Sequence, residues 1–178
     1  MSVDPGRLAP LLAELSRRMA DGTPPVALQR ACALLRGSLP AYRWVGIYLL
    51  DGGTLRLVAW DGEHPTEHVA IPLGEGVCGR AAREQRVVNV ADVRSAPEYL
   101  ACFLETRSEI VVPIFDGGVV IGEIDVDGNE VAAFDGSDER FLTLVADRLA
   151  GSSRQTLAHL PERPIGPAPR GSGPARPS

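Results

Sequence analysis

The stretch that decides the fold reads RWVGIYLLDGGTLRLVAW over residues 43–60. Its two apolar runs, 43–50 and 54–60, flank Asp51-Gly52-Gly53, which is typical of a tight turn between antiparallel strands. Residues 108–115 and 119–126 repeat this pattern around Asp116-Gly117-Gly118. Residues 68–73 and 86–90 add two shorter strands. The chain is therefore predicted to form one mainly antiparallel sheet of about six strands.

Amphipathic helices are predicted on both sides of these strands along the chain. Apolar residues recur at helical spacing within 7–37, with a break at Thr23-Pro24-Pro25 that suits the start of a second helix. A short helix is expected over 77–84 and a last one over 137–157. This order favours an α+β domain in which helices cover one face of the sheet and leave the other to solvent or a pocket.

Length and composition favour one globular domain. A chain of 178 residues suits a single domain, expected over 1–160 with sheet and pocket in 42–127, and 161–178 is rich in Pro, Gly and Arg, which predicts a disordered tail. The net charge of -5 and the lack of a Lys or Arg run argue against a nucleic-acid surface. Because no membrane-length apolar run or secretory signal pattern is found, a cytoplasmic location without membrane contact is expected.

The segment GEGVCG at 74–79 has the spacing of a dinucleotide-binding loop. The following helix is too short for a parallel crossover, however, and no second βαβ unit exists, so we reject this interpretation. The glycines are interpreted instead as allowing a tight turn and a close approach of the backbone to a ligand. Cys78 then lies at a helix N-terminus, where the local field is expected to lower the pKa of its thiol.

Acidic residues alternate with apolar ones near the end of the predicted sheet. Glu123, Asp125 and Asp127 fall on one face of their strand, and Glu109 heads a neighbouring apolar strand. A solvated sheet face is the simpler explanation, but Asp is poorly suited to strands, which suggests a use. Acids crowded in a pocket raise at least one pKa and provide a proton donor near neutrality, and they attract ammonium groups.

Two aromatic residues share a face of the first strand. Trp44 and Tyr48 flank Gly46, which predicts either a slot with apolar walls or ordinary aromatic packing.

The three cysteines do not suggest a disulfide framework, because their number is odd and no export is expected. Cys102 falls in a long irregular stretch, where thiols are more often accessible and reactive. Cys32 is spaced like the apolar residues of its helix and is expected in the core. No Cys/His spacing supports a zinc site, so no metal is predicted.

Six segments occur in a specific order along the chain: WVGIY at 44–48, IPLGEGVCG at 71–79, DV at 92–93, LAC at 100–102, SEIVVP at 108–113 and IGEIDVD at 121–127. The spacing from Cys78 to Cys102, and from Cys102 to Ser108-Glu109, belongs to the same pattern. Taken together, this set resembles the free methionine-R-sulfoxide reductases, a branch of the GAF fold. The resemblance covers most of the chain up to about Leu149.

By this resemblance, Trp44 and Tyr48 line the pocket for the methyl sulfoxide. The acids Glu109, Asp125 and Asp127 bind the free amino acid and help to protonate the sulfoxide oxygen.

The resemblance also implies the redox cycle. Cys102 attacks sulfur and becomes a sulfenic acid, and a second thiol then forms a disulfide that a thioredoxin-like partner reduces. No bound cofactor is implied, and a homodimer is left open.

One position departs from the family pattern. The family commonly has a third cysteine three residues before the Ile-Pro pair, where this chain has His68. If that cysteine is the usual resolving thiol, Cys78 takes over its task. The competing hypothesis is a non-catalytic GAF domain that binds a small ligand and signals through a partner, which requires no thiol chemistry.

Overall fold

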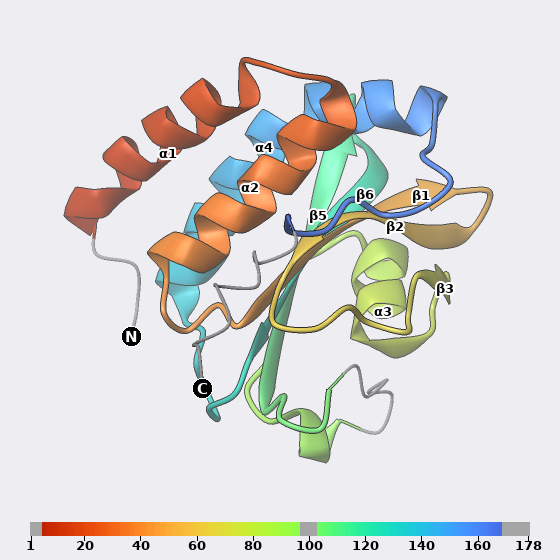
Figure 1. Cartoon of the computed structure of the whole chain (residues 1–178). Coiled ribbons are helices and arrows are strands. Elements are labelled where there is room, and N and C mark those ends of the chain that lie inside the picture. Colours follow the sequence, from red (N-terminus) through yellow and green to blue (C-terminus); the bar gives the residue numbers. More distant parts are fainter. Residues whose placement is uncertain (1–4, 97–102, 169–178) are drawn as a thin grey trace, which may run out of the picture.

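The computed structural model describes residues 5–96 and 103–168. Its six strands form one sheet in the order β3-β2-β1-β6-β5-β4, and every neighbouring pair is antiparallel (Figure 1). The α+β fold and both hairpins are therefore confirmed. The strands are β1 (Trp44–Asp51), β2 (Thr54–Asp61), β3 (Ala70–Pro72), β4 (Val88–Val90), β5 (Ser108–Asp116) and β6 (Val119–Gly128).

Of the four α-helices in the described residues, three cover one face of this sheet, as predicted. They are α1 (Pro5–Met19), α2 (Pro24–Ser38) and α4 (Gly136–Ala158), and their apolar residues pack with Val45, Ile47 and Leu49 of β1 in the larger core. The short helix α3 (Gly76–Glu84) packs on the opposite face, where it joins a second, smaller core (Figure 1). Helix α3 therefore covers part of the second face. A single-turn 3-10 helix (Val93–Ser95) follows β4.

Helix starts follow the local chemistry of the chain. Pro24 and Pro25 occupy the first two positions of α2 after Thr23, whose backbone is extended but whose side chain makes no capping hydrogen bond. At α4, Asp135 and Asp138 form a reciprocal capping box. The Tyr42 hydroxyl also donates to Oδ1 of Asp138 at 2.9 Å, which ties the start of α4 to the segment before β1.

The chain after α4 differs from the sequence-based expectation. Disorder was expected from Pro161, yet residues 161–168 run along β2, and Ile165 pairs in parallel with Ala59 (Figure 1). Two backbone hydrogen bonds join Ile165 to β2. The edge of β2 thus holds Ile165 within the segment expected to be disordered, because an unpaired strand edge can bind a segment without a periodic apolar pattern.

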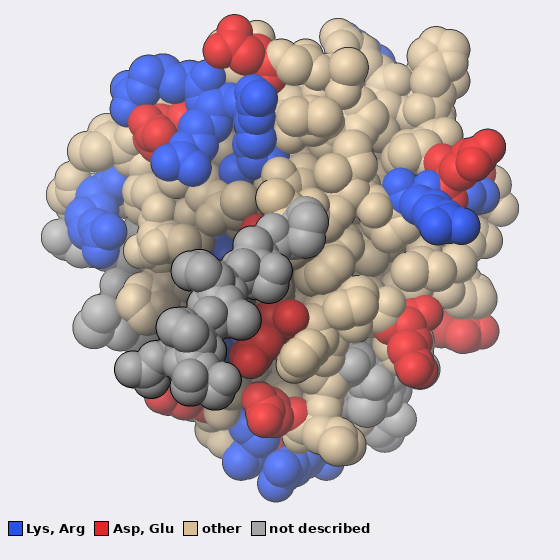
Figure 2. Space-filling view, viewed as in Figure 1, with Lys and Arg blue, Asp and Glu red and all other residues tan. Residues whose placement is uncertain are grey.

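Charged side chains of both signs lie on the surface. Figure 2 shows a basic patch over α1, whose last turn carries Arg17 and Arg18 in ion pairs with Glu14. Among the described residues, no helix combines the length and apolar character needed to cross a membrane.

Candidate functional site

Four carboxylic side chains lie on the sheet face that carries α3. Glu123, Asp125 and Asp127 alternate along β6 with Ile124 and Val126, which belong to the core beneath the other three helices. Successive residues of a strand project to opposite faces, so the same strand builds both cores.

The neighbouring strands add the other predicted side chains to this face. Directly opposite residues in an antiparallel pair project to the same side. Trp44 of β1 and Glu109 of β5 both pair with Asp127, from its two sides, and Gly46 of β1 pairs with Asp125. Tyr48 also belongs to the second core, with Trp44. Three adjacent strands thus bring the predicted binding residues onto one face.

Burial changes the proton affinity of these carboxyl groups. All four acids are at most 4% exposed. Burial raises the pKa of Asp125 to about 7. It raises the pKa values of Glu109, Glu123 and Asp127 well above the usual range, and the charge of Asp125 adds to each of these shifts. At neutral pH the cluster therefore retains protons that a bound acceptor can use.

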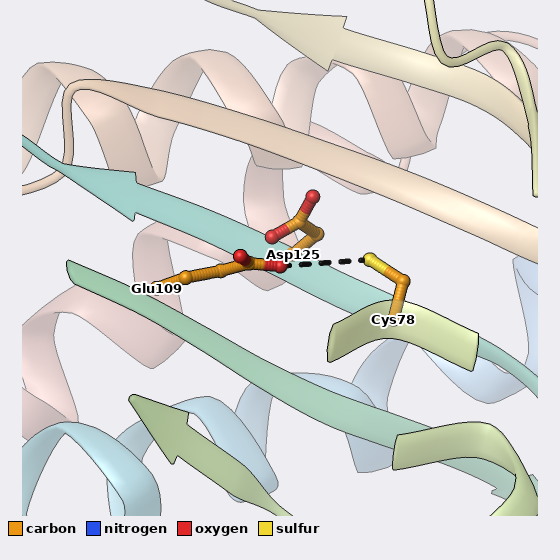
Figure 3. A group of neighbouring side chains, drawn as sticks. All are labelled: Cys78, Glu109 and Asp125. Carbon is orange, nitrogen blue, oxygen red and sulfur yellow. Dashed lines mark hydrogen bonds between the residues drawn. The ribbon is translucent and has the colours of Figure 1, made fainter. Parts of the chain in front are cut away.

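Cys78 projects from the first turn of α3 toward these acids (Figure 3). Its Sγ atom lies 3.9 Å from Oε1 of Glu109, and the residue is buried. The predicted lowering of the Cys78 pKa is wrong. Burial raises this pKa, and the charges of Asp125, Glu123 and Glu109 raise it further. A thiolate here would add negative charge to a desolvated acidic site, which outweighs the field of the helix N-terminus.

The Trp44 ring lies against its own strand. A Cβ atom added at Gly46 or at Gly62 would overlap this ring, so both glycines are needed for its position. The ring therefore fills the space above Gly46 where the sequence suggested an apolar slot. Tyr48 is fully buried, and its hydroxyl donates to the backbone carbonyl of His68 at 2.9 Å.

A cavity of about 410 Å³, a size that suits a small ligand, lies where β1 begins and β6 ends. Trp44 and Asp127 line it, whereas Tyr48, Glu109 and Asp125 are buried outside its lining. Because Asp125 and Asp127 interact electrostatically, Asp127 connects the cavity with the buried acids. The other lining residues are Arg43, Glu63, His64, Phe103, Leu104, Glu105, Thr106, Gly128 and Asn129.

Several buried polar atoms of this site have no hydrogen-bond partner among the described residues. They are Nε1 of Trp44, Oδ1 of Asp125 and both carboxylate oxygens of Glu123 and of Asp127. Thr106 lies near enough to Asp127, and the Cys78 thiol near enough to Glu123 and Asp125, to lower the pKa values of these acids slightly, but neither contact meets hydrogen-bond geometry at the unpaired oxygens. Each unpaired buried polar group costs about 1–3 kcal/mol, so a concentration of them indicates a site whose partner is a ligand. Protonated carboxyl groups can donate to a ligand oxygen, and ionised ones can accept from an ammonium group.

A cation is also sterically compatible with part of this cluster. Cys78, Glu109 and Asp125 each offer one ligand atom, and these atoms lie within 4.8 Å of one another. The sequence predicts no metal here, because it has no cysteine and histidine spacing typical of a zinc site.

Of the other two cysteines, Cys32 lies within the described residues and Cys102 does not. Cys32 is fully buried in the larger core, as predicted, and burial raises the pKa of its thiol. Cys102, the predicted nucleophile, lies outside the described residues. The next residue in the chain, Phe103, lines the cavity.

Some residues of this region have no role in the predicted site. Glu123 shares the predicted strand face with Asp125 and Asp127 and is fully buried, but the resemblance assigned it no binding role. His64 and Thr106 line the cavity from irregular segments, where no periodic pattern marks them.

Comparison with known proteins places this site in a family. Residues 23–152 match the GAF domain family. The free methionine-R-sulfoxide reductase of Escherichia coli is 34% identical over 122 residues, which cover 68% of this chain and 73% of that protein.

Two solved structures extend the comparison. The type II free methionine-R-sulfoxide reductase of Thermoplasma acidophilum is 42% identical, with a TM-score of 0.70 over 82% of this chain and 96% of that one. The Neisseria meningitidis enzyme, solved in complex with its substrate, is 32% identical, with a TM-score of 0.79 over 88% and 94%. This chain therefore belongs to the GAF domain family and is similar in sequence and fold to its free methionine-R-sulfoxide reductases.

Proposed function

We propose that this chain reduces free L-methionine-(R)-S-oxide to methionine by cysteine thiol chemistry. The observation that carries the proposal is the group of buried, unpaired carboxyl oxygens beside a cavity, in a chain similar to reductases of this substrate. Reduction of a sulfoxide requires a proton at its oxygen. A carboxyl group with a pKa near 7, such as that of Asp125, is suited to supply it at neutral pH.

The binding roles proposed here are those that the resemblance to the free methionine-R-sulfoxide reductases implies. Glu109 and Asp127 are proposed to share with Asp125 the work of binding the substrate ammonium group and protonating the oxygen. Trp44 and Tyr48 are proposed to provide the apolar contact for the methyl group, since both belong to the second core on this face.

Cys102 is proposed as the nucleophile. Its thiolate attacks the sulfoxide sulfur, and the sulfur–oxygen bond breaks as the oxygen passes to the cysteine with one proton from the acids. The products are methionine and the Cys102 sulfenic acid. The substrate sulfur gains two electrons, and the Cys102 sulfur loses two.

Cys78 is proposed as the resolving thiol. Its raised pKa keeps it protonated while Cys102 reacts, and its buried position beside Glu109 supports a role at this site. Attack of the Cys78 sulfur on the sulfenic acid would form a disulfide and release water. A thioredoxin-like dithiol would then reduce the disulfide. His68 occupies the position of the family's third cysteine, which leaves this task to Cys78.

The test is turnover of the purified full chain with racemic free methionine sulfoxide and a dithiol reductant. Chiral analysis is expected to show that only the R epimer disappears, while acetylated methionine sulfoxide, which lacks the free ammonium group, reacts poorly. If excess substrate yields neither methionine nor a Cys102 sulfenic acid, the proposal fails, and a ligand-binding GAF domain without catalysis becomes the better account.

A further inference from the structure

We propose that residues 161–168 form a strap that positions the aromatic wall of the cavity by acting through Trp60. We treat its residues as positioning residues rather than catalytic ones, because the contacts that carry the proposal are with β2 and the Trp60 ring. It also lies outside the residues 23–152 that match the GAF domain family.

The strap completes the outer edge of β2. Strand β3 pairs with residues 54–56 of β2, and the N–H of Leu57 donates to the carbonyl of Val69. Ile165 occupies the edge beyond this point, opposite Ala59. The backbone N–H of Ile165 donates to the carbonyl of Val58 at 2.9 Å, and the N–H of Trp60 donates to the carbonyl of Ile165 at 3.0 Å. The strap is therefore anchored by strand-type hydrogen bonds on both sides of Ala59.

The residue after this anchor lies against the Trp60 ring. A Cβ atom added at Gly166 would lie 2.6 Å from Cε2 and from Cζ2 of Trp60. No side chain fits in that space without moving the ring or the strap. Strap and ring are thus in direct contact through a residue that has to be glycine.

Trp60 transmits this contact to the cavity. Its ring stacks on that of Trp44 with a centroid separation of 6.4 Å and an interplanar angle of 14°. The Trp44 ring in turn lies 5.9 Å from that of Phe103, and both Trp44 and Phe103 line the cavity. Three aromatic rings therefore connect the strap to the cavity wall, at separations typical of favourable aromatic pairs.

A displaced strap is expected to weaken substrate binding rather than the chemical step. Trp44 contributes an apolar wall, so its misplacement reduces binding of the ground state and the transition state alike. The kinetic part of this inference rests on the proposed reductase function. The structural part does not, because the chain contains two tryptophans, Trp44 and Trp60, and intrinsic fluorescence therefore reports on this stack.

The test uses the full chain with Gly166→Val, which places a side chain against the Trp60 ring, and with Ile165→Pro, which removes the N–H donor to Val58. Gly151→Val is the matched control, because a Cβ atom added at Gly151 meets nothing within 4 Å. Both strap variants are expected to raise the KM for free methionine-(R)-sulfoxide on the order of tenfold with kcat nearly unchanged. They are also expected to shift tryptophan emission to longer wavelength and to increase acrylamide quenching.

A double-mutant cycle with Trp60→Leu separates this role from a general loss of stability. If the strap acts through Trp60, Gly166→Val raises KM no further in the Trp60→Leu background. Additive effects, or unchanged KM and quenching in both strap variants, would overturn the inference. If the wild type reduces no sulfoxide, the proposed function fails separately, and the strap is then judged by quenching alone: an increase supports it and no change rejects it. If Gly166→Val does not fold, Gly166→Ala and Ile165→Pro give the same readouts.

Discussion

The two faces of the sheet are both buried, but burial has opposite consequences on them. Beneath α1, α2 and α4, the side chains of Ile47, Ile124 and Val126 are fully buried among other apolar groups. Removing such groups from water contributes roughly 25 cal/mol per Å² to stability. This face is a stabilising core.

Beneath α3, the alternate residues of the same strands bury Glu109, Glu123, Asp125 and Asp127 together with the thiol of Cys78. Here burial raises the pKa values of the acids, because burying their ionised forms costs free energy. Burial also leaves carboxyl oxygens without hydrogen-bond partners, which costs free energy as well. The comparison teaches that one face stabilises the domain, while the other retains an unfavourable arrangement that a ligand can satisfy. Substitutions on the two faces should therefore separate stability from activity.

The largest difference in turnover is expected among the three variants in which one cysteine is replaced by serine. Cys102→Ser should abolish turnover, and Cys78→Ser should reduce at most about one substrate per protein because the sulfenic acid cannot be resolved. Cys32→Ser, on the helix-covered face, should keep wild-type turnover and lose about 1–3 kcal/mol of stability by burying a hydroxyl. Single-turnover and steady-state assays with mass mapping of disulfides check this. Wild-type turnover in Cys102→Ser would refute the assignment of the nucleophile.

The acids should behave as functional rather than stabilising residues. Asp125→Asn and Glu109→Gln remove a proton donor or an ammonium partner but nearly preserve shape. We expect kcat/KM to fall about 10²- to 10⁴-fold in each. Urea unfolding at pH 7 should show a free energy of unfolding that is not lower than the wild-type value, because the neutral amide of Asp125→Asn avoids the cost of burying a carboxylate. Loss of fold in both variants would instead assign these acids a structural role, and full activity would remove them from the mechanism.

Ile124 provides the matched substitution on the opposite face, next to Asp125 in sequence. Ile124→Ala should lower the free energy of unfolding by about 2–5 kcal/mol, because it leaves a cavity in the larger core. Its kcat/KM, measured on folded protein at low temperature, should remain near the wild-type value. A loss of activity as large as that of Asp125→Asn, with stability retained, would show that the two faces are not functionally separate.

The pH dependence of stability should report the buried acids with a smaller effect. The Asp125 pKa is raised from 3.8 to about 7, so the folded protein keeps this proton at pH values where the unfolded chain has lost it. The free energy of unfolding should therefore fall as pH rises through this window, by at most about 1.4 kcal/mol per pH unit from this group. Raised pKa values at the other three acids extend the decline upward.

Urea unfolding at about pH 5, 6, 7 and 8 measures this slope. Asp125→Asn should make it shallower, and Ile124→Ala should leave it unchanged. A wild-type stability that instead rises with pH over this range would mean that the acids are ionised in the folded protein.

Much of the fold was predictable because it depends on local chemistry. The hairpins at Asp51-Gly52-Gly53 and Asp116-Gly117-Gly118 form as expected, since turn residues and strand periodicity are short-range properties. The alternation of Asp125 with its apolar neighbours also predicted that the acids of this strand share one face of the sheet. The helical spacing of Cys32 likewise predicted its burial.

The sequence by itself determined which side chains share a face of each strand and helix, because those periods are intrinsic to the backbone. Only the tertiary structure decided what covers each face. Packing of α3 over the acids reversed the expected shift in the Cys78 pKa, because desolvation and neighbouring charge depend on contacts distant in sequence. The position of the Trp44 ring and the pairing of Ile165 with β2 were equally beyond local patterns, since each requires space or an open edge that a different segment provides.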